Sequence, residues 1–171
     1  MLIETIVLII LLCFWITAIS LAPFVPTFGK DLERINKICD LKAGDNFVEI
    51  WCGTAKVSRF IALKNPNANI IWVELNFFLY LYSKLKTSIF WPKNLHIKFW
   101  NALKYDYHNT QVVYIFWVPK TVSWKIKDKV YKELPKNWKY ISYVFKVENW
   151  EGKEVMRDFS EKQNSIYVCV K

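Results

Sequence analysis

The sequence predicts an α/β domain with a mostly parallel sheet, preceded by one membrane-spanning helix. Three observations support this fold class. Short apolar, β-branched runs alternate with stretches of helical periodicity, polar turns separate them, and one long apolar stretch without charge stands near the start. The 171 residues suffice for one core-forming domain, and a composition with 53% hydrophobic residues and only four glycines excludes a disordered chain.

The charge-free stretch covers residues 5–29, and residues 6–22 within it are nearly all apolar or small. About 17 to 20 such residues cross a hydrocarbon core of roughly 30 Å as a helix. We therefore expect residues 1–24 to form a transmembrane anchor and residues 25–171 to form one further domain. Pro23 and Pro26 are expected to end the helix at the membrane interface.

The charges beside this stretch predict its orientation. Lys30, Arg34 and Lys37 follow it, whereas no lysine or arginine precedes it. By the positive-inside rule, the protein is a single-pass membrane protein whose C-terminal domain lies in the cytoplasm. A cleaved signal peptide is the alternative, but the usual positive region is absent and Glu4 stands in its place.

The first half of the domain follows a helix, strand, helix pattern. Apolar residues at helical spacing predict an amphipathic helix after Thr27, with Leu32, Ile35, Ile38 and Leu41 on its buried stripe and Asp31 off it. Short apolar runs predict strands at residues 47–51 and 70–75, and periodic stretches predict helices at 54–63 and 77–86. The 77–82 segment is apolar or aromatic all round, so we expect this helix to contact a membrane or an intramembrane partner.

The second half repeats the alternation and then changes to a hairpin. Strands are expected at residues 96–99, 112–118 and 140–147, and an i, i+4 apolar stripe predicts a helix from 122 to 134. Residues 153–159 and 165–170 are separated by a polar turn and predict an antiparallel hairpin. Strands that alternate with helices form a parallel sheet covered on both faces, and such sheets bind ligands beyond the carboxyl ends of their strands.

Three of these strand ends carry polar residues suited to a bound nucleoside. The first strand turns into a helix at Gly53, and Glu74 ends the second strand at a distance along the chain where a carboxylate can accept ribose hydroxyls. Asn101 follows the third strand, where its amide either contacts an adenine edge or caps the next turn.

With these motifs the chain resembles the class I (seven-β-strand) S-adenosylmethionine-dependent methyltransferases. It looks most like the small, membrane-anchored protein-lysine methyltransferases related to the enzymes that modify the ATP synthase c subunit and the adenine nucleotide translocase. The segments that carry the resemblance are PFVPT at 23–27, LKAGD at 41–45, EIWCGTAK at 49–56, VELN at 73–76, FWNAL at 99–103, IFWVP at 115–119 and SYVF at 142–145.

The resemblance implies a Rossmann-like, seven-stranded methyltransferase sheet with a terminal antiparallel hairpin, and S-adenosyl-L-methionine as cofactor. It places Pro26 and Thr27 over the cofactor, the turn with Glu49, Trp51, Gly53 and Thr54 under its methionine part, Glu74 at the ribose and Asn101 at the adenine. Family members usually have glycine at the positions of Trp51 and Ala55. Either the Trp51 ring turns away into the core and the site survives, or it fills the site and the protein is a non-catalytic relative.

The implied function is methylation of a lysine of a protein substrate, possibly a membrane protein, by an enzyme at the bilayer. Methyl transfer requires no dedicated nucleophile, so no catalytic residue is assigned; the wall of a lysine channel is sought among Phe116, Trp117, Pro119 and Trp150. The alternative is a catalytically inactive binding or scaffold protein. Only the net charge of +9 favours a nucleic-acid partner, and the lysines are dispersed over helix faces, which argues against it.

Four cysteines and two histidines complete the inventory of candidate ligands. They show none of the close spacings typical of zinc sites, so no metal site is expected and the cysteines are interpreted as buried thiols. His96 and His108 have no evident partner and receive no role.

Overall fold

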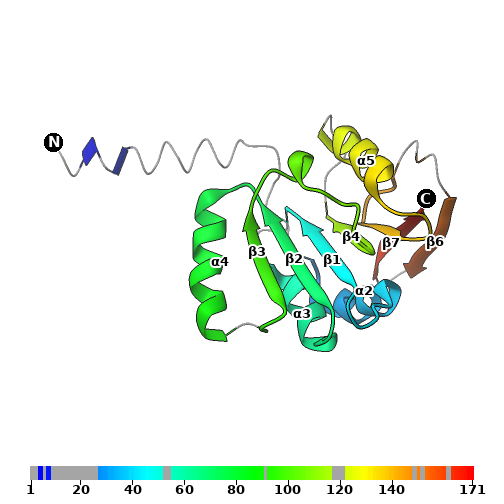
Figure 1. Ribbon diagram of the computed structural model, residues 1–171, viewed down its shortest axis with the longest axis horizontal. Coiled ribbons are helices and arrows are strands. Elements are labelled where there is room, and N and C mark those ends of the chain that lie inside the picture. Colours follow the sequence, from blue (N-terminus) through cyan, green and yellow to red (C-terminus); the bar gives the residue numbers. More distant parts are fainter. Residues whose placement is uncertain are drawn as a thin grey trace.

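A computed structural model gives the fold (Figure 1). It describes residues 4–5, 7–8, 27–51, 55–90, 92–116, 122–147, 150, 153–160 and 163–171, and of residues 86–90, 122–123, 153–160 and 163 it describes the backbone alone. Of the expected anchor, residues 1–24, only residues 4–5 and 7–8 belong to this part of the chain. Within the described residues, no helix has both the length and the apolar character needed to cross a membrane.

Seven strands form one sheet in the order β3-β2-β1-β4-β5-β7-β6. Their bounds are β1 (Asn46–Ile50), β2 (Asn69–Glu74), β3 (Leu95–Phe99), β4 (Val112–Ile115), β5 (Lys139–Tyr143), β6 (Lys153–Ser160) and β7 (Gln163–Val170). β1 to β5 pair in parallel, whereas β7 runs antiparallel to both β5 and β6. The prediction of a mostly parallel sheet with a terminal antiparallel hairpin is confirmed.

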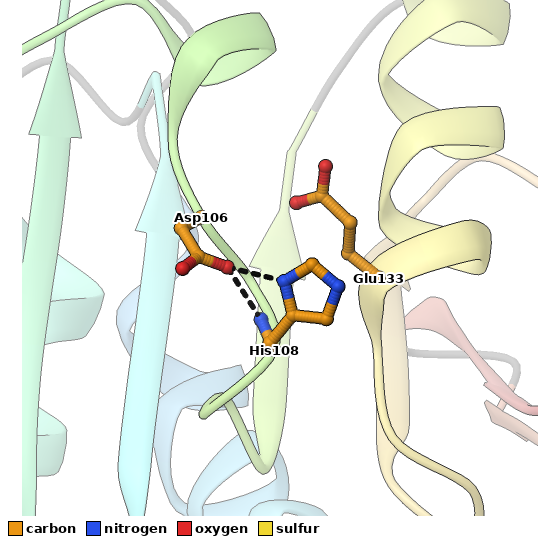
Figure 2. A group of neighbouring side chains, drawn as sticks. All are labelled: Asp106, His108 and Glu133. Carbon is orange, nitrogen blue, oxygen red and sulfur yellow. Dashed lines mark hydrogen bonds and ion pairs between the residues drawn. The ribbon is translucent and has the colours of Figure 1, made fainter.

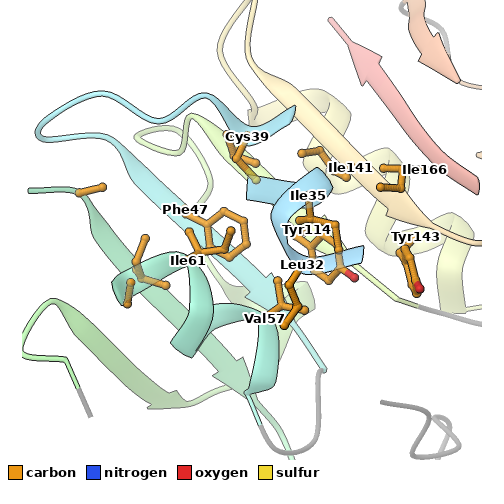
Figure 3. Close-up of a cluster of buried hydrophobic side chains, with 14 of the residues drawn as sticks. Leu32, Ile35, Cys39, Phe47, Val57, Ile61, Tyr114, Ile141, Tyr143 and Ile166 are labelled. Carbon is orange, nitrogen blue, oxygen red and sulfur yellow. The ribbon is translucent and has the colours of Figure 1, made fainter. Parts of the chain in front are cut away.

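One face of the sheet is covered by helices α2 (Leu32–Cys39), α3 (Lys56–Lys64) and α4 (Phe77–Phe90). Alternate strand residues such as Phe47, Tyr114 and Ile141 point to this side and pack against Ile35 and Ile61 (Figure 3). Because side chains alternate along a strand, one apolar run can supply both faces of the sheet.

The opposite face is covered by α5 (Val122–Glu133) and the short 3-10 helix η2 (Ala102–Lys104). Val48, Ile50 and Val113 alternate to this side and pack against Ile126 and Val130 of α5. The apolar stripe predicted for α5 is therefore its buried face. Helices on both faces, as predicted, leave the strand ends as the accessible part of the sheet.

The structure corrects one residue assignment in the first helix. Asp31, expected off the buried stripe, is fully buried at the end of the 3-10 helix η1 (Gly29–Asp31), where it forms an ion pair with Arg34 at 2.7 Å. Ile38, expected on the buried stripe, is partly buried and packs against the same cluster as the fully buried Cys39. The helix ends at Cys39, and Asp40 after it has a left-handed φ of 47°.

The fifth strand is shorter than predicted. Residues 140–147 were expected to be extended, but β5 ends at Tyr143 because Val144 turns to a φ of 73°. Apolarity continues past this point although the strand does not. The Val144 backbone N–H donates to the Ser165 carbonyl at 2.8 Å, so the turn is fixed by the start of β7.

Candidate functional site

The carboxyl ends of β1 to β4 lie together at one edge of the sheet, as parallel pairing requires. This edge, called here the carboxyl edge, brings together Trp51 after β1, Glu74 at the end of β2 and Asn101 after β3. Of the predicted cofactor-binding residues, Pro26, Gly53 and Thr54 lie outside the described residues. The others are placed as follows.

Trp51 and Ala55 stand where glycine is usual in the family that the chain resembles, and both keep a left-handed backbone. Their φ angles are 53° and 51°. A left-handed backbone raises the conformational free energy of a residue with a side chain by roughly 1 to 2 kcal/mol, whereas glycine has no such cost. The turn after β1 thus retains a backbone conformation suited to glycine although the two glycines are replaced.

The Trp51 side chain is partly buried and packs against the apolar cluster on the α5 face. Its backbone N–H donates to the Val73 carbonyl at 3.2 Å, which continues the β1–β2 pairing by one residue. Glu49 and Glu74 alternate to the other face of the sheet. Of the two positions considered for the indole, the structure favours packing against the core.

Glu49 is 1% exposed and faces helix α3. Its Oε2 accepts hydrogen bonds from the Ser58 backbone N–H at 2.7 Å and from the Ser58 hydroxyl. A carboxylate is favourable at a helix N-terminus because it accepts from backbone N–H groups of the first turn. Glu49 therefore fixes the start of α3 to β1 and so supports the turn between them.

Glu74 is a buried acid, 4% exposed, at the last position of β2. Its Oε1 accepts from the Asn76 backbone N–H at 2.7 Å, while its carbonyl accepts from Trp100 N–H at 3.0 Å. Burying a carboxylate is costly unless polar groups surround it. Its place at a strand end, next to the neighbouring β3 end, is the one that the sequence predicted for a ribose contact.

Asn101 caps the turn that follows β3. Its Oδ1 accepts from the Leu103 backbone N–H at 2.9 Å, at the start of η2. Of the two roles left open by the sequence, capping is observed. The same side chain carries an amide NH2 group, so a hydrogen bond to a ligand at this edge is chemically compatible with the cap.

Thr27 is 5% exposed and lies over the end of β4, where its hydroxyl is 3.0 Å from the Tyr114 hydroxyl. Its carbonyl accepts from Lys56 Nζ at 2.9 Å, in the first turn of α3. Sequence reasoning assigned no role to Lys56 or Tyr114, although Lys56 belongs to a quoted motif. Together these contacts fix the segment before α2 directly beside the turn after β1.

A buried polar cluster holds the same segment from the other side. The Tyr143 hydroxyl donates to Asp31 Oδ2 at 2.5 Å and accepts from the Asn164 amide at 2.8 Å. Arg34 bonds Asp31 and also the Asn164 carbonyl, at 3.1 Å. Burial, and then the hydrogen bond to Asp31, raise the pKa of Tyr143 to about 12. The sequence alone gave no signal for this cluster.

Of the four residues sought for a lysine channel, the two that the structure describes, Phe116 and Trp150, lie apart. Phe116 follows β4 and packs edge-on against Tyr143, with ring centroids 4.8 Å apart. Trp150 packs on the opposite face, stacked on Tyr140 at 5.1 Å, and its indole N–H donates to the Val170 carbonyl. Trp117 and Pro119 lie outside the described residues. Phe116 alone, among the described candidates, borders the carboxyl edge.

Asp106, His108 and Glu133 bring one ligand atom each within 4.8 Å of one another (Figure 2). His108 Nδ1 lies 2.6 Å from Asp106 Oδ1, so this histidine, expected to have no partner, has one two residues earlier. Glu133 accepts from the Tyr107 backbone N–H and pairs with Lys129. These bonds account for the grouping of the three side chains.

A shallow pocket of about 460 Å³ lies at the other end of the strands, between the end of α3 and the starts of β2 and β3. Asn69, Asn94 and His96 are among its lining residues. The Asn94 amide donates to three backbone carbonyls there, those of Ala62, Asn65 and Ala68. None of the predicted site residues that the structure describes lines this pocket.

No protein-family model matches this sequence, and no curated protein matches it. Solved structures do match the fold. An RNA methyltransferase from Salinibacter ruber, in complex with S-adenosyl-L-homocysteine, has a TM-score of 0.73 at 15% identity over 85% of this chain and 93% of its own. A precorrin-6y C5,15-methyltransferase from Geobacter metallireducens has a TM-score of 0.64 at 14% identity over 85% and 91%.

A coclaurine N-methyltransferase, bound to N-methylheliamine and S-adenosyl-L-homocysteine, has a TM-score of 0.57 at 10% identity over 72% of this chain and 40% of its own. The similarity therefore extends across methyltransferases with different substrates. The chain has the fold of the class I S-adenosylmethionine-dependent methyltransferases.

Proposed function

We propose that this protein is an S-adenosylmethionine-dependent methyltransferase, anchored in a membrane by residues 1–24, that methylates a lysine of a protein substrate. The observation that carries the cofactor assignment is the carboxyl edge itself. A left-handed turn follows β1, and a buried acid, Glu74, ends β2 in a methyltransferase-type sheet. The structural neighbours solved with S-adenosylmethionine or its demethylated product support the same cofactor.

The described residues fit such a ligand. Glu74 offers carboxylate oxygens to the ribose hydroxyls, and Asn101 offers an amide to the adenine. Leu75 and Trp100, 46% and 54% exposed, follow directly on the ends of β2 and β3 and offer apolar surface to a flat base. The Trp51 indole packs toward the α5 face, which leaves the Glu74 face of the turn to the ligand.

When bound, the cofactor supplies a methyl carbon that a neutral lysine amine attacks while the carbon–sulfur bond breaks, and the product ammonium then loses one proton. The protein binds, aligns and shields the reactants, which requires no nucleophile of its own. Thr27 and the segment that it begins, fixed by Tyr114 and Lys56, stand beside the turn and exclude water from that side.

The lysine substrate and the anchor are supported by sequence features. The resemblance is strongest to membrane-anchored protein-lysine methyltransferases, and the uncharged stretch at residues 6–22 has the length of one span. The following lysines and arginine favour a domain on the cytoplasmic side. A protein whose lysine lies at or near the bilayer is then the accessible substrate class.

Calorimetric titration of the full chain with S-adenosylmethionine and S-adenosylhomocysteine tests the cofactor assignment. Glu74→Gln keeps the size of the side chain but loses charge-assisted hydrogen bonds worth about 1.5 to 3 kcal/mol each, so affinity should fall by at least about tenfold. The matched control is Glu33→Gln on α2, an exposed acid away from the edge. Native affinity in Glu74→Gln, or no binding by the native chain, contradicts the proposal.

The presence of Trp51 where glycine is usual in the family that the chain resembles favours the alternative, a catalytically inactive binding or scaffold protein. If the indole moves into the site when ligand approaches, Trp51→Gly should raise cofactor affinity above that of the native chain. If the packing seen here persists, Trp51→Gly should leave affinity unchanged and lower stability slightly. A native chain that binds neither ligand, with a Trp51→Gly variant that binds both, establishes the inactive alternative.

A further inference from the structure

The outer side of α4 exposes large apolar side chains next to the carboxyl edge. Phe77, Phe78 and Leu81 are 51%, 42% and 43% exposed, and Phe99 at the end of β3 is 45% exposed. The Phe77 ring meets Phe78 and Phe99 edge-on, with centroids 5.9 and 5.7 Å apart. We call these four residues the α4 patch. A helix that covers a sheet normally presents polar residues outward, so such a patch marks a contact surface.

The inner side of the same helix is already satisfied. Tyr80 packs on the cluster of Ala55, Trp72 and Ile97, with its ring 5.5 Å from that of Phe99, and Ser83 is buried. The inner side of α4 therefore packs on the sheet, and the α4 patch is the surface that stays exposed when it does so. Burial against this domain does not account for it.

The length of the chain before Thr27 limits where a membrane can lie. The uncharged stretch at residues 6–22 ends five residues before Thr27, and five residues reach at most about 17 Å when fully extended. Thr27 is fixed at the carboxyl edge by Tyr114 and Lys56. If residues 6–22 span a bilayer, its surface lies close to this edge, where α4 begins.

The charges of this edge have the sign that suits anionic lipid. Its acids, Asp31, Glu49 and Glu74, are buried at 0%, 1% and 4% exposure. Among the described residues beside them, Lys30, Lys56, Lys98 and Lys104 are exposed, and the exposed acid Asp106, two residues after Lys104, pairs with His108. Exposed lysines near a bilayer are attracted to anionic headgroups, and exposed aromatic rings partition into the headgroup region.

We propose that the α4 patch docks on an anionic lipid bilayer, so that the carboxyl edge faces the membrane. The inference rests on the anchor of the proposed function but not on its cofactor site. Docking at the patch and anchoring by residues 1–24 would together give the domain one orientation, because a single anchor alone leaves it free to rotate about the linker.

Depth-dependent fluorescence quenching in the full chain tests this docking. A fluorophore is attached to a Phe78→Cys variant, with Cys13 and Cys52 replaced by alanine; the other two cysteines, Cys39 and Cys169, are buried. The matched control is Leu63→Cys, 61% exposed at the end of α3 and at the opposite edge of the sheet. Both proteins are reconstituted in mixed phosphatidylcholine and phosphatidylglycerol vesicles that contain a lipid-borne nitroxide quencher.

Quenching at position 78 should exceed that at position 63 by about fivefold, because an interfacial apolar face lies roughly 5 to 10 Å into the headgroup boundary. Replacing Phe77 and Leu81 by serine should remove the difference. Equal quenching at 78 and 63 overturns the proposal. A second outcome also overturns it: the fluorophore at position 78 is shielded from aqueous iodide but is not quenched by the lipid-borne nitroxide. In that case protein covers the patch, either a second copy of the chain or residues 1–26.

Discussion

The segment from Thr27 to Cys39 and helix α4 lie on the same face of the sheet but are held there by different interactions. The segment is fixed by directional bonds between buried groups: Thr27 with Tyr114, Lys56 with the Thr27 carbonyl, and Asp31 with both Arg34 and Tyr143. Helix α4 is held by ring contacts, and its outer side remains exposed.

This difference indicates where the structure tolerates amino-acid substitutions. Hydrogen bonds between buried groups specify one arrangement, and an incomplete set leaves a polar group buried without a partner. Apolar contacts are not directional, so an exposed apolar face accepts a new neighbour without losing an old one. Substitutions should therefore be severe in the segment and mild on the outer side of α4.

Asp31→Ala should have the largest effect on stability. Removing this carboxylate leaves Arg34 and the Tyr143 hydroxyl without their buried partner, and breaking a buried ion pair costs about 3 to 5 kcal/mol. Urea unfolding measures the loss. The control is Glu33→Ala, which removes an exposed ion pair with Lys64 and should cost less than about 1 kcal/mol. Equal losses in the two variants would refute the ranking.

Tyr143→Phe should cost less, about 1.5 to 3 kcal/mol, because it removes a hydrogen bond to a charged group but keeps the ring against Phe116. It should also change the pH dependence. The raised pKa of Tyr143, about 12 against an ordinary 10, means that the folded state holds its proton more tightly.

The stabilisation linked to this proton is complete below pH 10 and is lost as the pH rises from 10 to 12. The unfolding free energy of the native chain should thus fall through this interval more steeply than that of Tyr143→Phe. Unfolding curves recorded at several alkaline pH values give the difference. Parallel slopes would show that the hydroxyl is not coupled to folding.

Ala55→Gly and Ala62→Gly compare a strained backbone with a relaxed one in adjoining parts of the chain. Both alanines are buried, but only Ala55 has a left-handed φ, of 51°. Glycine at Ala62 costs about 1 kcal/mol of helix propensity, whereas glycine at Ala55 relieves strain of similar size. Thermal unfolding should place Ala55→Gly above Ala62→Gly in stability; the reverse order would show that Ala55 is not strained.

Phe78→Ser should have the smallest effect, within about 0.5 to 1 kcal/mol by urea unfolding, because its ring is nearly half exposed before the change. The contrast is Ile35→Ala in α2, a fully buried position where truncation costs about 2 to 5 kcal/mol. If Phe78→Ser lowered the free energy of unfolding as much as Ile35→Ala, then contacts on the outer side of α4 would be needed to hold this helix on the sheet.

The sequence predicted the strands well because their signal is local. Apolar, β-branched runs located all seven strands, and the ends differ by a few residues because pairing with neighbours, not composition, ends a strand. β5 shows this plainly, since Val144 is apolar yet leaves the strand to bond with Ser165. The predicted anchor and the lysine substrate stay predictions.

The candidate site was only partly predictable for the same reason. Glu74 is conspicuous as one acid in an apolar run, so its position at the edge could be inferred. The burial of Asp31 could not, because its partner Tyr143 is 112 residues away in the chain. The direction of the Trp51 indole could not be inferred either. Its φ of 53° interrupts the alternation of side chains along the strand, from which the face that a side chain points to is normally inferred.

The position of β7 between β5 and β6 has a consequence for synthesis on the ribosome. β5 is made before β7, yet its second edge is filled by residues 163–170, whose Ile166 and Cys169 also complete the cores on the two faces. Until those residues emerge, the nascent chain carries an open strand edge and two incomplete cores. Such edges pair readily with other chains, so the nascent chain is most prone to misassembly in the interval between the synthesis of β5 and that of β7.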